Sequence, residues 1–154
     1  MGTRSIIAKQ QGDSWAGRYA HWDGYPTHQG ASIWAIVQRD GWEQASKTFV
    51  DEHFYWSSLN PNMPASEPDE PRWINVEGYG IAGNELQASP NEWYTPEDYK
   101  DSWCEYVYVI AKAGLMVIRI YDEKVLGFFR WEEGEPDWQA VQDAPHNEEE
   151  EVTL

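Results

Sequence analysis

The residues best suited to chemistry are concentrated in one short segment, residues 21–28, which reads His-Trp-Asp-Gly-Tyr-Pro-Thr-His. The segment holds two imidazoles, a carboxylate, a phenol and an indole. His21 and Asp23 are two residues apart, so their side chains share a face if a strand continues through them. Asp23 could then orient His21 as an acid/base pair. A two-histidine, one-carboxylate iron site, completed by His28 or His53, is the alternative.

A structural role explains the same segment without a ligand. Asp23 can open a turn, Trp22 can pack into the core, and His21 can donate a structural hydrogen bond. Arg4 leads the first expected strand and could either bind an anion beside this segment or lie free on the surface. We expect no metal and no cofactor, and we assign no catalytic residue. The candidate ligand-binding residues are Arg4, His21, Trp22, Asp23, Tyr25 and His28.

Two further motifs suggest chemistry that their surroundings do not support. Residues 78–83 spell Gly-Tyr-Gly-Ile-Ala-Gly, which matches the dinucleotide-binding pattern G-x-G-x-x-G. That pattern needs a helix directly after it, whereas the following residues contain two prolines and no helical apolar period. Cys104, the only cysteine, opens an apolar strand beside Glu105, and both surroundings disfavour a reactive thiolate. We expect a glycine-rich strand end and a packed thiol, and the sequence favours binding over catalysis.

The elements that must position these residues follow from their apolar patterns. Short turns at residues 112–114 and 122–124 require antiparallel neighbours. We predict an α+β fold, β-β-α-α-β-β-β-β, with a mainly antiparallel sheet of five to six strands and two helices packed on one face. The strand at 103–111 is apolar on both sides and is expected to be central. The other strands are expected at 5–9, 16–22, 72–82, 115–121 and 125–131, and the helices at 27–39 (capped by Thr27) and 42–53, with a short one near 95–98.

The chain is expected to form one domain, residues 1–131, followed by an acidic tail. Residues 60–71 contain four prolines and three acids, which is typical of an irregular surface linker. Residues 132–154 contain nine acids and no lysine or arginine. We expect this segment to be largely disordered, although Trp138 and Val141 could dock a short helix onto the sheet.

The charge of the chain limits its partners. It has 27 acidic and 11 basic residues and a net charge of −16. This balance argues against binding to nucleic acid through its phosphates and against an anionic membrane surface. Imitation of nucleic acid stays open, because the acids of residues 67–105 could cluster in space. A single cysteine and the lack of a long apolar run favour a cytoplasmic protein.

The first third of the chain resembles a known group of proteins. Residues 2–8, Gly-Thr-Arg-Ser-Ile-Ile-Ala, and residues 19–26, Tyr-Ala-His-Trp-Asp-Gly-Tyr-Pro, are similar to a group of small uncharacterised proteins of bacteriophages, prophages and some bacteria. The resemblance implies a phage origin and a site near residues 21–26. Our first hypothesis is a non-enzymatic protein that binds or inhibits a host or cellular protein through an acidic, aromatic surface. The second is a small-molecule or nucleotide-derivative binder, or an enzyme, with its site at residues 21–28.

Overall fold

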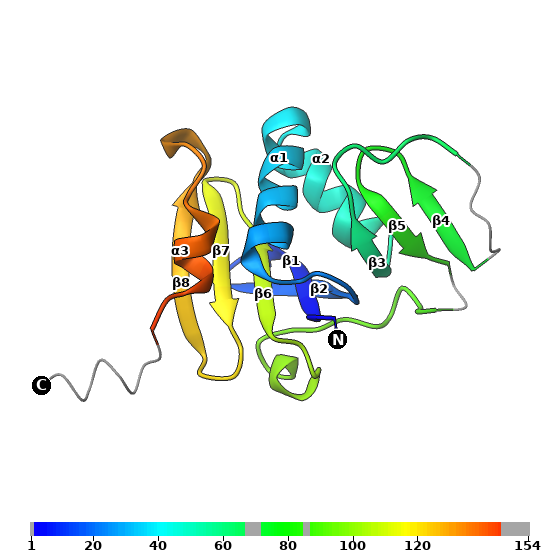
Figure 1. Ribbon diagram of the computed structural model, residues 1–154. Helices are drawn as coiled ribbons and strands as arrows, with labels where there is room; N and C mark the ends of the chain where they lie inside the picture. The colour runs from blue at the N-terminus through cyan, green and yellow to red at the C-terminus, as the bar shows by residue number, and fades with distance from the viewer. Residues whose placement is uncertain (1, 67–71, 85–86, 146–154) are drawn as a thin grey trace, which may run out of the picture.

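Eight strands form one mixed sheet in the computed structural model of the chain, in the order β4-β5-β3-β2-β1-β6-β7-β8 (Figure 1). The structure describes residues 2–66, 72–84 and 87–145. The α+β class is confirmed, but the sheet has eight strands where five to six were expected. The strands are β1 Ser5–Gln11, β2 Ser14–Ala20, β3 Tyr55–Leu59, β4 Trp73–Val76, β5 Gly80–Gly83, β6 Tyr106–Ile110, β7 Gly114–Arg119 and β8 Lys124–Arg130.

The centre of the sheet is built from strands that are distant in sequence. The β1–β2 hairpin lies in the middle, with β1 parallel to β6 and β2 parallel to β3. The remaining pairs, β3/β5, β4/β5, β6/β7 and β7/β8, are antiparallel. β6 is buried along its whole length, as its apolar sequence predicted. Local turns therefore identified the hairpins, whereas the two parallel pairs depend on contacts across the chain.

The extra strands come from residues 55–83. The stretch expected as one extended segment, 72–82, is two strands, β4 and β5, joined by a turn at Gly78, where φ is +78°. β3 was not predicted, because Tyr55-Trp56-Ser57-Ser58-Leu59 lacks a regular alternation of apolar and polar residues. In the structure, β3 also has a register shift against β5. Gly80, in β5, lies so close to β3 that a Cβ there would be 2.2 Å from the Ser58 carbonyl oxygen.

Both expected helices lie on one face of the sheet (Figure 1). The first comprises a π-helical turn η1, Pro26–Gly30, and α1, Ala31–Asp40; the second comprises α2, Trp42–Ser46, and a π-helical turn η2, Lys47–Asp51. Thr27 is not the cap that we expected: its backbone N–H and its hydroxyl both donate to Gln142 Oε1, at 3.1 and 3.0 Å. Apolar side chains of these helices and of the sheet form the larger core, which includes Ile33, Ile36, Phe49, Trp56, Tyr108 and Leu115.

The domain extends further toward the C-terminus than residue 131. After a 3₁₀ turn η4, Trp131–Glu133, a short helix α3, Trp138–Gln142, packs on the same core. Trp138 is only 7% exposed, and its ring contacts those of Trp34 and Phe129. The expectation of a largely disordered segment from residue 132 is therefore wrong for α3. The acid run 148–151 lies outside the described residues.

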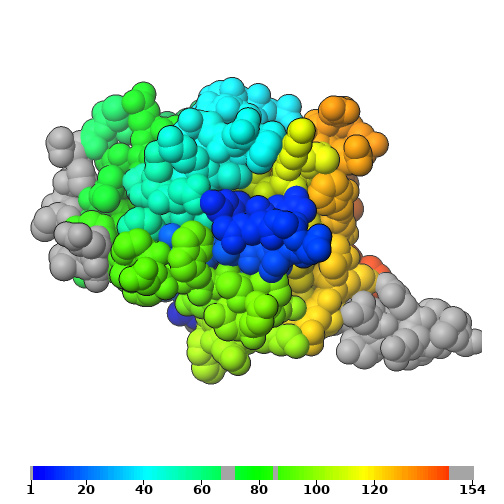
Figure 2. Space-filling view, turned by 180° about the vertical axis from the view of Figure 1, so that it is seen from behind, coloured from blue at the N-terminus to red at the C-terminus, as the bar shows by residue number. Residues whose placement is uncertain are grey.

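On the opposite face of the sheet, the described residues form no α-helix. A second, smaller core of Ile6, Trp15, Val107, Ile118 and similar residues lies there. The segment before β6 partly covers it: Tyr94 pairs with Gly17, and Tyr99 contacts Trp15 edge-on. Figure 2 shows this segment (yellow-green) beneath the β1–β2 hairpin (blue). It contains a single 3₁₀ turn, η3, Tyr99–Asp101, in place of the helix expected near 95–98.

Candidate functional site

The turn within residues 21–28 is fixed to the core at Gly24. Its N–H donates to the Thr3 carbonyl (2.7 Å), and its carbonyl accepts from the Tyr108 hydroxyl (2.5 Å). A Cβ at Gly24 would lie 2.7 Å from the Ser5 Cβ, so only glycine fits. Asp23 precedes it with φ of +55°, the left-handed conformation that Asp tolerates better than most residues. Asp23 and Gly24 therefore have a structural role that the turn sequence predicted.

The turn separates the candidate residues onto two sides of the sheet. Tyr25 packs against the larger, helix-side core, and its ring lies 6.2 Å from that of His28. His28 Nε2 is 3.3 Å from the Leu59 carbonyl oxygen. Neither side chain is placed with His21. The six candidate residues therefore do not converge in one pocket.

His21 and Trp22 are brought together, with two tyrosines that the sequence analysis did not select, and Arg4 acts on this group electrostatically. The His21 and Trp22 rings meet edge-on at 4.6 Å, and Tyr19 Oη is 2.7 Å from His21 Nδ1. The Tyr19 ring lies 5.2 Å from that of Tyr55 on β3. Tyr19 could have been selected, because it is two residues before His21 and therefore on the same strand face.

Burial and the Arg4 guanidinium set the protonation of this group. Burial raises the pKa of Tyr19 to about 12, against the opposing effect of Arg4. Burial also raises the pKa of Tyr55 and lowers that of His21, and Arg4 lowers the His21 pKa further. The imidazole and both phenols are consequently neutral at pH 7.

Three exposed aromatic side chains lie at the same end of the sheet as this group. Trp22 follows β2, Trp103 precedes β6, and Tyr121 follows β7, and these positions coincide because neighbouring strands alternate in direction around parallel β1 and β6. In Figure 1 this end is at the bottom. With strands about 4.8 Å apart, the row spans about 14 Å from β2 to β7. We call Trp22, Trp103 and Tyr121 the aromatic rim; they are 45%, 87% and 63% exposed.

Trp103 has the least usual geometry of the three. Its φ is +64°, a left-handed conformation that is rare for a bulky residue. Its neighbours hold it there: the Ser102 hydroxyl donates to the Tyr99 carbonyl (2.6 Å), and the Cys104 N–H donates to Ser102 Oγ (3.2 Å). Ser102 and Cys104 are both buried. The indole is therefore presented to solvent by an anchored loop rather than by a loose one.

The surroundings of the rim are acidic, as the composition predicted. Asp101 and Glu105 flank Trp103 in sequence and are exposed, and Glu123 follows Tyr121. Lys100 forms an ion pair with Glu123 at 2.9 Å, which joins the loop before β6 to the β7–β8 turn. Two more apolar side chains, Val125 and Phe128, are exposed on the adjacent strand β8.

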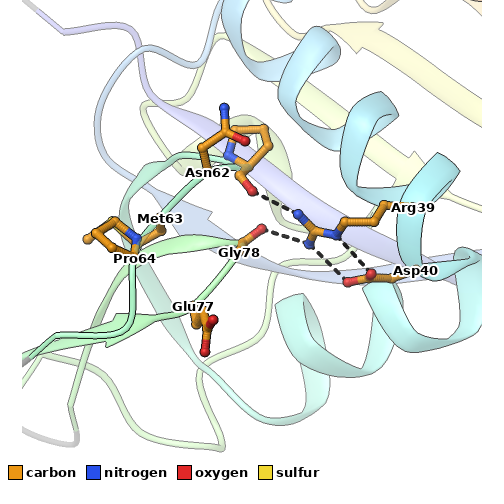
Figure 3. Close-up of a pocket in the computed structure, with 8 residues that line it drawn as sticks. Arg39, Asp40, Asn62, Met63, Pro64, Glu77 and Gly78 are labelled. Carbon is orange, nitrogen blue, oxygen red and sulfur yellow. Dashed lines mark hydrogen bonds and ion pairs between the residues drawn. The ribbon is translucent and has the colours of Figure 1, made fainter.

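A depression lies elsewhere, between the end of α1 and the β3–β5 region (Figure 3). Its volume is about 550 Å³. Arg39, its most conspicuous cation, donates to the carbonyls of Pro61 (2.7 Å) and Gly78 (2.9 Å) and to the Asp40 carboxylate (2.8 and 3.0 Å). These structural hydrogen bonds occupy the Arg39 guanidinium. Arg39 is the one cation among the described lining residues, so none is left to bind an anion there.

The remaining motifs have structural explanations. The glycine pattern at 78–83 forms a turn and strand β5, and the described residues that follow it begin no α-helix before β6. Cys104 is buried, and burial raises its pKa to about 11, which disfavours the thiolate. Within residues 2–66, 72–84 and 87–145, no three His, Cys, Asp or Glu side chains are grouped as metal ligands would be.

No helix in the described part of the chain has both the length and the apolar character needed to cross a membrane. No family model, curated protein or solved structure matches the chain.

Proposed function

We propose that the protein is a non-enzymatic binding protein that engages another protein through its aromatic rim. Trp103 is the observation that carries this proposal. An indole that is 87% exposed leaves apolar surface in water, and its left-handed backbone adds a cost of about 1–2 kcal/mol. The Ser102 bonds and the burial of Cys104 hold the backbone conformation, but they leave the indole in water. Burial of the indole against a partner would offset both.

The composition of the rim supports the same function. Tryptophan and tyrosine are enriched among the residues that contribute most to protein–protein affinity, and such residues cluster at the centre of an interface. Trp22, Trp103 and Tyr121 lie beyond the ends of three strands at one end of the sheet, where a partner could contact all of them at once. Anchored loops also lose little conformational entropy on binding.

Charge supports a partner with a basic contact surface. The exposed carboxylates of Asp101 and Glu105 lie beside Trp103, and the whole chain carries a net charge of −16. Complementary charge around an apolar centre speeds association and selects among partners. The resemblance to phage and prophage proteins extends the proposal to a phage-encoded factor that binds, and inhibits, a host protein in the host cytoplasm.

Affinity capture tests this function. The wild-type chain and a Trp103→Ala/Tyr121→Ala variant are used to capture proteins from bacterial lysate, and captured proteins are identified by mass spectrometry. Ile74→Ser is the matched control, because Ile74 is an exposed apolar residue on β4, at the far edge of the sheet. We expect a protein that is retained by the wild type and the control and lost by the rim variant. Equal capture by all three would refute binding through the rim.

A further inference from the structure

Arg4 acts electrostatically on four groups that are neutral at pH 7. Tyr19, His21, Tyr55 and Cys104 all respond electrostatically to its guanidinium, and none of them carries a charge at pH 7. Arg4 is exposed and forms no ion pair with any described residue.

The nearest carboxylate along the backbone belongs to Glu105. Its N–H donates to the Arg4 carbonyl at 2.8 Å, so the two residues lie side by side, directly before the parallel strands β1 and β6. Its side chain nevertheless makes no ion pair with Arg4 among the described pairs. The guanidinium keeps its five donors largely available, in the fork that matches an oxyanion.

The hydrogen bond between Tyr19 and His21 Nδ1 leaves His21 Nε2 as a second donor beside Arg4. When the Tyr19 hydroxyl donates to His21 Nδ1, at 2.7 Å, its oxygen still has lone pairs for Arg4, which can only donate. A neutral imidazole that accepts at Nδ1 carries its proton on Nε2. No described residue bonds to His21 Nε2, so this nitrogen and the exposed Arg4 guanidinium are both available to a ligand.

Aromatic rings extend from these donors in two directions. The Trp22 ring contacts His21, and the rings of Tyr19, Tyr55 and Trp73 form a row across β2, β3 and β4, with centroids 5.2 and 6.0 Å apart. All of these rings except Trp22 are partly buried. A planar ligand body can pack against such surfaces, which favour offset or edge-on contact.

We propose that Arg4 and the Nε2–H of His21 form a binding site for an oxyanion, a carboxylate or phosphate, carried by a small molecule with a planar aromatic body. Tyr19 is a positioning residue that fixes the His21 tautomer. The site goes beyond the proposed protein-binding function and does not depend on it, because it requires no partner.

Matched small probes test the site on the purified full chain. Indole-3-acetate and phenyl phosphate carry the two kinds of anion, and indole-3-acetamide has the body of the first without its charge. Binding is followed through amide chemical shifts in ¹H–¹⁵N spectra. We expect at least one anion to bind at millimolar concentration or below, to shift resonances of residues 4, 19 and 21, and to bind at least about tenfold more tightly than the amide.

Variants separate the site from general attraction. Arg4→Gln should weaken anion binding at least about tenfold, whereas Arg130→Gln, at an exposed arginine on β8, should not.

Tyr19→Phe should change the pH dependence of indole-3-acetate binding, since it frees His21 Nδ1. Because the proposed ligand stabilises imidazolium, that binding should tighten as the pH falls from 7.5 to 5.5, a range in which indole-3-acetate remains ionised. Binding by phenyl phosphate alone would assign a phosphate site, and by indole-3-acetate alone a carboxylate site.

Three results would overturn the proposal. The first is equal affinity for indole-3-acetate and its amide, together with no binding of phenyl phosphate. The second is full anion binding by Arg4→Gln. The third is the absence of any shift at residues 4, 19 and 21 with either anion. Since Arg4 is exposed, its substitution should leave the melting temperature unchanged, so a loss of binding cannot be attributed to unfolding. None of these results bears on capture of a protein by Trp103.

Discussion

Single buried polar residues hold the irregular parts of this fold, and Arg18 is the clearest example. It lies on β2 and is only 1% exposed. Its guanidinium lies 3.4 Å from the centre of the Trp93 ring, and it donates to the carbonyls of Val50 (2.8 Å), Pro90 (3.1 Å) and Glu92 (2.9 Å). Burial lowers its pKa to about 10, so it remains charged at pH 7. Arg18 thereby ties the segment before β6 to the helix side of the sheet.

Replacement of Arg18 should destabilise the whole domain. Arg18→Met leaves three carbonyls without their donor, and we expect a loss of about 2–4 kcal/mol in the free energy of unfolding. Urea denaturation measures this loss. Arg130→Met, at an exposed arginine on β8, is the control and should cost less than about 0.5 kcal/mol. A similar small effect for Arg18→Met would show that its bonds do not hold the segment.

Histidine protonation should make stability depend on pH. Burial lowers the pKa of His53, whose ring contacts that of Trp56 at 5.3 Å, and burial and Arg4 lower the pKa of His21. The folded state then binds fewer protons than the unfolded state. Stability is therefore fully present above the unfolded histidine pKa of about 6.5 and decreases as the pH falls through that value toward the folded pKa.

Urea midpoints at pH 7.5 and 5.5 check this sign, in a range above the titration of most carboxylates. We expect a lower midpoint at pH 5.5. The difference should shrink in His53→Gln and shrink further when His21→Gln is added. An undiminished difference in the double variant would assign the pH dependence to other groups.

At the scale of elements, α3 shows where composition misleads. Residues 132–154 contain nine acids, yet Trp138 and Val141 are buried in the larger core. Two apolar residues on one face of a single helical turn are enough to dock it. A Cβ at Gly30 would lie 2.7 Å from the Trp138 ring, so glycine at this point of η1 makes room for the indole.

Truncation separates α3 from the residues beyond it. Removal of residues 146–154 should leave the free energy of unfolding within about 0.5 kcal/mol of the full chain. Trp138→Ala should cost about 3–5 kcal/mol, because it removes a large buried side chain. Thermal and urea denaturation of the two variants provide the comparison. Equal stability of Trp138→Ala and the full chain would show that the domain ends before α3.

The sequence predicted the strands that pair with a close neighbour along the chain, but not the pairing of strands that are distant in sequence. β1, β2, β6, β7 and β8 were predicted because each has a hairpin neighbour joined by a short turn. The parallel pairs β1/β6 and β2/β3 were not, because the pairing residues are separated by long stretches of chain. The register that places Tyr19 beside Tyr55 exists only through β2/β3 pairing, so this part of the candidate site was not accessible from the sequence.

At the scale of the whole molecule, the sheet gathers exposed aromatic residues at one end. The sequence analysis anticipated an acidic, aromatic surface but selected only Trp22 of the rim. Trp103 was assigned to a strand, in which it would be one apolar residue among several. Its left-handed backbone depends on the Ser102 bonds and on the burial of Cys104, which are tertiary features. The separation of residues 21–28 onto two faces of the sheet also depends on tertiary contacts, so the sequence did not predict it.

Trp103→Asn provides the most direct measurement of the proposed function. Asn tolerates the left-handed conformation better than Trp and leaves no indole in water. We expect the free energy of unfolding to stay the same or rise by up to about 1 kcal/mol, while the affinity for the captured partner falls about 30-fold or more, as for a residue that dominates an interface. Both quantities are measured on the same purified protein, by urea denaturation and by calorimetric titration with the partner. Undiminished affinity, or a marked loss of stability, would show that Trp103 serves the fold rather than a partner.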